Sequence, residues 1–252
     1  VRKWDAGKRK TGIRGVSTGA GREAVEADLI RAGEFDDRQS RRLLDADSIE
    51  AVVEAAEETI YDEPLRAAYP AFEESDVLVP LENAVDRAFY DRLLTGLPGG
   101  EPVRQYEAFL EAEVDFRNAA NALRLARSGA EIDPAEYFID GGQLFTRTSL
   151  ARLARNLDEL VEYVAGSQYA DDLGPALREL EEADSLIAFE QATDAALLAY
   201  ADKLGTIHPV SVTPVISYIL ANTRAVENIR PIALGNEAGL SADAIESELV
   251  IT

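Results

Sequence analysis

The sequence contains no cysteine, no methionine, one histidine and only four lysines among its 252 residues. The absence of cysteine excludes disulfides, thiolate nucleophiles and thiolate metal sites. His208 lies in the proline-flanked stretch "TIHPVSVTP", and one histidine cannot build a histidine-rich metal site or proton relay, so a plain loop residue is expected. A chain that starts with Val1 and has no methionine is expected to be a trimmed piece of a longer product.

Long apolar runs are also missing. No segment approaches the roughly 18 apolar residues that a membrane-spanning helix needs, and no short apolar segment follows a charged start as in a signal peptide. A soluble chain is therefore predicted. Its 46% hydrophobic residues are enough for a sizeable core.

Positive charge is scarce except at the start of the chain. The formal net charge is −22, with 47 acidic residues against 25 basic ones, and such a field repels nucleic acid and anionic lipid. Acid excess with little lysine resembles the proteomes of salt-loving archaea, where ionic strength screens the repulsion. Residues 1–24 are locally basic, which we interpret as a solvated helix face, with a site for an acidic partner as the alternative.

Helical periodicity is present along the whole chain. Apolar residues recur at steps of three and four over 45–62, after Pro80, and from Leu150 to Val164, where Gly166 ends the pattern and Thr148 or Ser149 can cap its start. Shorter helices are expected over about 171–182 and 184–204, the second ending at Gly205. No segment alternates with period two for long enough to favour a sheet, so the predicted class is all-α.

Comparison of the sequence with itself finds three related stretches about 106 to 110 residues apart. Asp5 and Asp115 occupy equivalent positions in the first two, and Gly33 and Gly142 follow in both. Such a long period predicts triplication of a helical lobe. In all three, an aliphatic residue precedes an arginine and a glycine follows five residues later: Ile13–Arg14–Gly19, Leu123–Arg124–Gly129 and Ile229–Arg230–Gly235.

The second copy carries asparagines on an otherwise apolar helical stripe. Asn118 and Asn121 fall in line with Leu110, Val114 and Leu125. A buried amide without a partner costs about 1–3 kcal/mol, so we expect both asparagines and Arg124 to bind carbonyls and carboxylates where helices cross. A structural role is favoured over a ligand site.

These stretches resemble a known family. "RKWDAGKRKTGIRG", "EVDFRNAANALRLARSG…YFIDGGQLF" and "PVISYILANTRAVENIRPIALGNEAGLSADAIESELV" are similar to the three repeats of the C subunits of archaeal A-type ATP synthases, which are related to the d subunits of vacuolar ATPases. The likeness extends over nearly the whole chain. It is most specific in the third copy, at Tyr218, Glu227, Asn228, Arg230, Gly235, Gly239 and Ile245.

The resemblance implies an all-helical funnel of three lobes around a pseudo-three-fold axis. It further implies a non-catalytic rotor subunit without cofactors, peripheral at the cytoplasmic face of the membrane, and the acid excess points to a halophilic archaeon as its source. Such a subunit would seat the rotor axle subunits on the membrane proteolipid ring and transmit torque. No nucleic acid or small-molecule substrate is expected.

The repeats predict lobes over 1–75, 76–180 and 181–252, with the first lobe lacking about 70–100 residues at its start. Two features depart from the family pattern: Gly7–Lys8 replaces an aromatic–asparagine pair, and Pro231 follows Arg230 directly, which is unexpected within a helix.

Other functions find weaker support in the sequence. "GVSTGAG" and "GKRKTG" lack the spacing of a phosphate loop. An all-α metal-dependent enzyme of the prenyl-transfer type is one alternative, but the pairs Asp36–Asp37 and Asp171–Asp172 lack a third carboxylate four residues on. A helical adaptor unrelated to ATPases is the other alternative.

Overall fold

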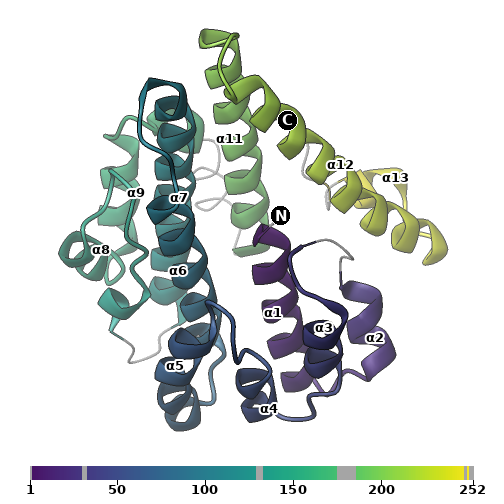
Figure 1. Cartoon of the computed structure of the whole chain (residues 1–252). Coiled ribbons are helices and arrows are strands. Elements are labelled where there is room, and N and C mark those ends of the chain that lie inside the picture. The colour runs from purple at the N-terminus through teal and green to yellow at the C-terminus, as the bar shows by residue number, and fades with distance from the viewer. Residues whose placement is uncertain (1, 30–32, 129–132, 175–185, 247–248, 250–252) are drawn as a thin grey trace. The chain divides into compact units, whose positions relative to one another are not determined.

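The computed structural model describes residues 2–29, 33–128, 133–174, 186–246 and 249, and the regular secondary structure of these ranges is entirely helical (Figure 1). This agrees with the predicted all-α class. The chain forms two compact units, Val1–Gly96 and Leu97–Thr252. These units reflect packing, whereas the three expected lobes over 1–75, 76–180 and 181–252 are defined by homology, so the lobes stay a prediction.

The first unit is built around α1. This helix lies against α2, α3, α4 and α6, and α5 packs on α6. Ile13, Val52, Leu65 and Val85 are among the side chains buried between these helices. The unit's helices are α1 (Arg2–Ser17), α2 (Arg22–Asp28), α3 (Asp37–Leu44), α4 (Ile49–Glu54), α5 (Asp62–Ser75) and α6 (Val79–Thr95).

The basic residues of α1 form ion pairs inside this unit. Lys10 Nζ lies 2.7 Å from Asp86 Oδ1 on α6, and the Arg14 guanidinium donates two hydrogen bonds to Glu82, also on α6. The solvated-face interpretation of the basic start is therefore wrong for Lys10, whose charge helps to hold α1 against α6, whereas Arg14 is paired but its side chain stays 57% exposed. The spacing of basic residues along one helix could not reveal partners that lie about 70 residues further on.

The second unit is built around α7, the longest helix described. α7 contacts η1 and α8 and also packs on α11, which forms a hairpin with α12. Phe116 of α7 stacks edge-on against Tyr169, with ring centroids 5.2 Å apart, and Tyr200 of α11 packs on both rings. The elements are α7 (Glu101–Ser128), η1 (Pro134–Tyr137), α8 (Arg147–Leu153), α9 (Leu157–Ala165), α11 (Leu186–Ile207), α12 (Thr213–Glu237) and α13 (Ala242–Glu246).

Several helix boundaries differ from those predicted. The apolar pattern over 150–164 spans two helices, α8 and α9, because Asn156 interrupts it and caps α9 by accepting a hydrogen bond from the Glu159 amide. The first of these begins after Thr146, with Ser149 as its capping-box partner. The pattern over 45–62 is helical only as α4, before the chain turns toward α5.

In the hairpin of α11 and α12, Gly205 does not end its helix and Pro231 does not break its helix, contrary to expectation. Gly205 stays inside α11, where the absence of a side chain lets Pro214 at the start of α12 approach closely. Pro231 lies inside α12, which continues to Glu237. Of the helix expected over 171–182, the part beyond residue 174 lies outside the described residues.

Candidate functional site

Asp115 fastens the loop after η1 to the middle of α7. Its buried carboxylate accepts hydrogen bonds from the backbone amides of Gln143, at 2.8 Å, and Leu144, at 2.9 Å. Gly142 lies so close that any side chain there would overlap the carboxylate. Burial raises the pKa of Asp115, although the amide hydrogen bonds act in the opposite direction.

Asp5 makes the same arrangement in the first unit. Its carboxylate accepts hydrogen bonds from the backbone amides of Glu34, at 2.7 Å, and Phe35, at 3.2 Å. Gly33 precedes these amides, at φ +120°, and a Cβ there would overlap Asp5. We call each set of aspartate, glycine and two following amides an aspartate clasp.

The segments that follow the two clasps match step by step. α3 and α8 both begin with a capping box, Asp36 with Gln39 in the first and Thr146 with Ser149 in the second. The next helices, α4 and α9, are capped by the side chains of Ser48 and Asn156. The repeat found in the sequence thus relates two segments with the same local hydrogen bonding.

The match extends through the turn that follows α4 and α9. Thr59 and Ser167 each donate to the carbonyl three residues before and accept from the amide two residues after. That amide belongs to a buried tyrosine in both cases, Tyr61 and Tyr169.

Asn118 and Asn121 make the hydrogen bonds that the sequence required, but with one loop instead of crossing helices. The Asn118 amide group donates to the Ile139 carbonyl and accepts from the Ile139 amide, both at 2.9 Å. Asn121 donates to the Tyr137 carbonyl at 3.4 Å. Both asparagines are buried, so they fasten η1 and the residues after it to α7. The Arg124 side chain and Gly129 lie outside the described residues.

The third copy matches the first in a different register from the predicted one. Gly15 packs against Val25, and Gly235 packs against Ile245 in the same way. Gly19 follows the first helix at φ +66°, and Gly239 follows α12 at φ +71°. Gly235 therefore corresponds to Gly15, and its predicted pairing with Gly19 is wrong.

The error amounts to about one helical turn, so both registers keep the same face of the helix in line. The hydrogen bonds decide between them: the amide of Ala20 donates to the Gly15 carbonyl, and the amide of Leu240 donates to the Gly235 carbonyl. In this register Arg14 corresponds to Leu234, so its predicted pairing with Arg230 is wrong as well.

Two further positions of the third copy were singled out by the sequence. Glu227 lies on α12 and accepts a hydrogen bond from Arg224 at 2.7 Å, so it is engaged within its own helix. The Arg230 side chain is outside the described part of the chain.

Arg9 is a buried cation that the sequence pattern did not reveal. Its side chain is 0% exposed, stacks over the Phe35 ring with the guanidinium carbon 4.6 Å from the ring centroid, and donates to the Ala55 carbonyl at 2.9 Å. Burial lowers the pKa of Arg9 to about 10. The equivalent position in the second copy is Ala119. The contrast in size between Arg9 and Ala119 was a signal in the sequence that could have drawn attention to Arg9.

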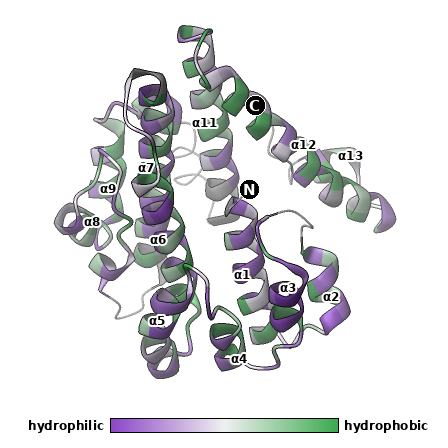
Figure 2. Cartoon of the chain, viewed as in Figure 1, coloured by the Kyte–Doolittle hydropathy of each residue, from purple (hydrophilic) through white to green (hydrophobic). Residues whose placement is uncertain are grey.

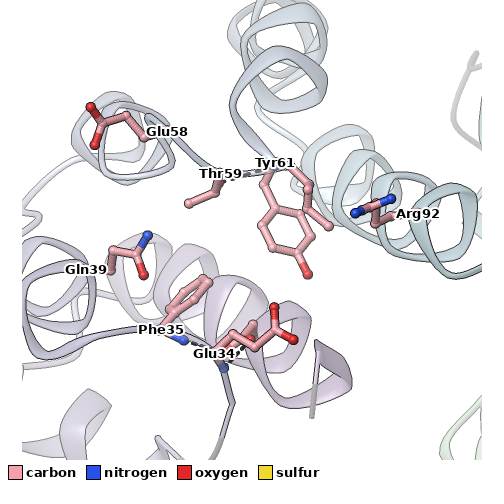
Figure 3. Close-up of a pocket in the computed structure, with 9 residues that line it drawn as sticks. Glu34, Phe35, Gln39, Glu58, Thr59, Tyr61 and Arg92 are labelled. Atoms are coloured by element: carbon pink, nitrogen blue, oxygen red, sulfur yellow. Dashed lines mark hydrogen bonds between the residues drawn. The ribbon is translucent and has the colours of Figure 1, made fainter. Parts of the chain in front are cut away.

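A cavity of about 280 Å³ lies beside the first clasp, between residues 34–39, the turn 58–61 and α6. Figure 3 shows the rings of Phe35 and Tyr61 and the side chain of Arg92 around it. Two of its polar groups are already engaged, Asp5 in the clasp and Gln39 in the capping box. Within the described ranges, no three or more histidine, cysteine, aspartate and glutamate side chains come together in a way that could hold a metal ion.

One member of each carboxylate pair considered as a metal ligand has a structural partner. Asp36 caps α3, and Asp172 lies 3.6 Å from Lys203 on α11. His208 contributes its carbonyl to the turn before α12, where it accepts from Ser211. These contacts join secondary-structure elements and present no arrangement of nucleophile, base and metal ligands.

Comparison with known proteins finds a family whose match includes all three repeated stretches. The ATP synthase (C/AC39) subunit family matches residues 1–248. The chain belongs to this family. Because the match includes both clasps and α12, it spans every feature described above.

Individual relatives come from salt-loving archaea and beyond. The chain is 78% identical over 252 residues to the C subunit of the A-type ATP synthase of Halorubrum lacusprofundi, covering 100% of this chain and 72% of the relative. It is 62% identical over 251 residues to that of Haloferax volcanii, with the same coverage. It is 28% identical over 257 residues to that of Methanococcoides burtonii, covering 100% of this chain and 70% of the relative.

Proposed function

We propose that this chain belongs to the C subunit of an archaeal A-type ATP synthase and acts as a non-catalytic socket between the rotor axle and the membrane proteolipid ring. The observation that carries the proposal is the family match over residues 1–248, together with relatives at 78% and 62% identity that bear this name. In this role the protein transmits torque between ion flow and ATP synthesis or hydrolysis.

The contacts of the described residues are consistent with this mechanical role. The clasps and caps join helices to the segments that follow them, as a part under torque requires. Broad contact with an axle needs a shaped surface and no cluster of catalytic groups.

We further propose that the protein lies peripherally at the cytoplasmic face of the membrane, with the proteolipid ring as its membrane partner, and the family relation supports this proposal. Among the helices that the structure describes, none combines the length and apolarity needed to cross a bilayer. Attachment through a partner ring needs no such helix.

We also propose that the full protein has three copies of one helical lobe around a pseudo-three-fold axis. Two matching clasps with matching caps support the first two copies, and the Gly15–Val25 and Gly235–Ile245 contacts support the third. The candidate structural positions of the copies are Asp5, Arg14, Gly19, Asp115, Asn118, Asn121, Arg124, Gly129, Glu227 and Gly235, with Gly235 paired to Gly15, while Arg230 loses its place because its pairing with Arg14 is wrong.

Purification of the full-length protein from a haloarchaeal host at multimolar salt tests the functional proposal. A tagged version should bring down the axle and ring subunits in one complex, whereas the purified protein alone should neither bind nor hydrolyse ATP. ATP turnover by the pure protein, or a tag that recovers neither axle nor ring, would overturn the proposal. A tagged Gly99→Ala variant is a matched control, because Gly99 has open space around it and should leave assembly unchanged.

A further inference from the structure

The buried ionic groups of the first clasp carry unequal charge. Lys8 is 7% exposed, Arg9 0% and Asp5 3%, so two cations and one carboxylate are shielded together from water. Figure 2 shows the hydrophilic stretches of α1, the helix that carries all three. The Asp5 carboxylate already accepts two backbone amides and lies 3.5 Å from Lys8 Nζ. It can compensate one cation, which leaves the charge of Arg9 without a counterion.

The neighbouring charges do not make up this difference. The charged groups that act on Arg9 at neutral pH are Asp5, which is shared with Lys8, and Arg42, which adds repulsion. Arg42 is paired with Glu57 at 3.1 Å, so that pair is neutral as a whole. Burial lowers the pKa of Arg9 to about 10, which still leaves it protonated at neutral pH. The region therefore buries one excess positive charge, which is costly without a partner.

The Arg9 guanidinium also has hydrogen-bond donors to spare. Its Nη2 donates to the Ala55 carbonyl at 2.9 Å, but the buried Nε and Nη1 atoms have no acceptor among the residues that the structure describes. Nε carries one N–H group and Nη1 carries two. Stacking on Phe35 stabilises the face of the guanidinium and leaves these groups on its edge unsatisfied. Buried donors of this kind normally have a partner, so an acceptor from outside the chain is expected there.

Space through which a ligand can approach lies close to these donors. Phe35 stacks on Arg9 and also lines the cavity beside the first clasp (Figure 3). Tyr61 lines the same cavity and lies close enough to Arg9 to act on its charge. The exposed carboxylates of Glu34 and Glu58 at the cavity do not keep a negative ion out at high salt, because the Debye length falls to about 3 Å at 1 M. A small anion can therefore approach Arg9 from solvent by way of this cavity.

The second clasp has neither the excess charge nor the spare donors. Lys8 and Arg9 correspond to Asn118 and Ala119 on α7, and the Asn118 side chain makes two hydrogen bonds with the backbone of Ile139. The same clasp is thus held there without buried cations. The basic pair is an addition in the first copy and not a requirement of the clasp, so it calls for a separate explanation.

We propose that Arg9 binds a small monovalent anion, which is chloride at high salt. One negative charge completes the balance of Lys8, Arg9 and Asp5, whereas a dianion would reverse it. The Ala55 carbonyl and the Phe35 ring hold the guanidinium in place, so its free edge is preorganised to donate to an ion. A halide accepts hydrogen bonds from any direction, which suits an edge that is closely surrounded by side chains. This site is separate from the contacts with axle and ring proposed above.

A crystal structure of the full-length protein grown in multimolar sodium bromide tests the proposal, because bromide replaces chloride and is located by its anomalous scattering. We expect bromide within hydrogen-bond distance of Arg9 Nε or Nη1. The second clasp is the internal control, and no bromide should lie beside Ala119. A water molecule or a protein group on the two Arg9 nitrogens, or bromide at both clasps, would overturn the proposal. This measurement needs no variant, so it decides the matter even where a substitution of Arg9 prevents folding.

Thermal unfolding of the full-length protein in sodium chloride and in sodium gluconate of equal ionic strength tests the same site in solution, since gluconate is too large to reach a buried guanidinium edge. On the change to gluconate, the midpoint of wild type should fall by at least about 3 °C more than that of Arg9→Met, because only wild type gives up a bound anion. Arg152→Met, the same substitution at an exposed arginine of α8, is the matched control and should follow wild type. Equal falls in wild type and Arg9→Met would overturn the proposal.

Discussion

The two aspartate clasps hold the same backbone geometry with different surroundings. The clasp of the second unit adjoins Asn118, Ala119 and the stacked rings of Phe116 and Tyr169. The clasp of the first unit adjoins Lys8 and Arg9, which both lie over the Phe35 ring. The hydrogen bonds to the backbone are the same in both, while the side chains filling the space around them are neutral in one and charged in the other.

This difference has a physical basis. A carboxylate that accepts two backbone amides fixes where a loop lies on a helix, and no apolar substitution can replace it. Packing around the clasp requires only that volume be filled and charges be paired, which different side chains can achieve. The clasp should therefore be the part of each lobe least tolerant of change.

Removing the carboxylate should give the largest effect. Asp115→Ala leaves the amides of Gln143 and Leu144 without their acceptor, which should lower the free energy of unfolding by about 3 kcal/mol, at about 1–3 kcal/mol for each donor. Chemical denaturation at constant multimolar salt measures it. A loss below about 1 kcal/mol would mean that the clasp does not hold the loop.

The first clasp should respond differently to the same change. Asp5→Ala also removes the carboxylate beside the buried Lys8 ammonium, which lies 3.5 Å from it. Adding Lys8→Leu should therefore recover part of the stability lost in Asp5→Ala, by about 1 kcal/mol or more. Double-mutant denaturation curves measure the recovery, and strictly additive losses would contradict this account.

The asparagines of the second copy should differ from each other. Asn118→Leu breaks two hydrogen bonds of 2.9 Å to Ile139 and should cost about 1–3 kcal/mol, whereas Asn121→Leu breaks one of 3.4 Å to Tyr137 and should cost less. The same denaturation assay compares them. A larger loss for Asn121→Leu would reverse the ranking that the geometry gives.

The glycine of the clasp should tolerate no side chain. Gly142→Ala places a Cβ against the Asp115 carboxylate and should cost about 1–3 kcal/mol, since the buried neighbours must move. Gly99→Ala is the control, because nothing lies within 4 Å of the position that its Cβ would take, and it should change stability by less than about 0.5 kcal/mol. Similar thermal midpoints for the two variants would argue against a tight clasp.

The smallest expected effect is a pH dependence. The pKa of Asp115 is higher in the folded protein than the unfolded value, so folding favours its protonated form. This group's contribution is fully present below the unfolded value of 3.8 and is lost as pH rises through the folded pKa. Asp115→Asn should remove that contribution, so the difference in unfolding free energy between wild type and variant should change with pH across this window. A constant difference would contradict the raised pKa.

Much of the secondary structure and one kind of site could be predicted from the sequence. The helices α6 and α7 follow from regular apolar spacing. The repeat marked the clasp aspartates and glycines as equivalent positions, but the sequence did not show that each aspartate contacts the glycine that follows in its own copy. The register of the third copy was wrong because a shift of one helical turn preserves the apolar face, and because Arg230 happens to precede Gly235 by the five residues that separate Arg14 from Gly19.

The burial and pairing of charged side chains were the main features that could not be predicted from the sequence. Arg9 and Lys10 lie in one basic run, yet one is stacked on Phe35 and the other is paired with Asp86 on α6. These partners are distant in the sequence, and a local charge pattern carries no information about them. The clasp donors were also missed, because backbone amides leave no trace in side-chain identity.

The central claim is that the three copies share a common local structure. An experimental structure of the full-length protein tests it most directly, by superposing α1, α7 and α12 together with the helices that pack on them. The account predicts that Asp5 overlays Asp115 and that Gly15 overlays Gly235. Helices that superpose only in another register, or that do not superpose at all, would contradict it.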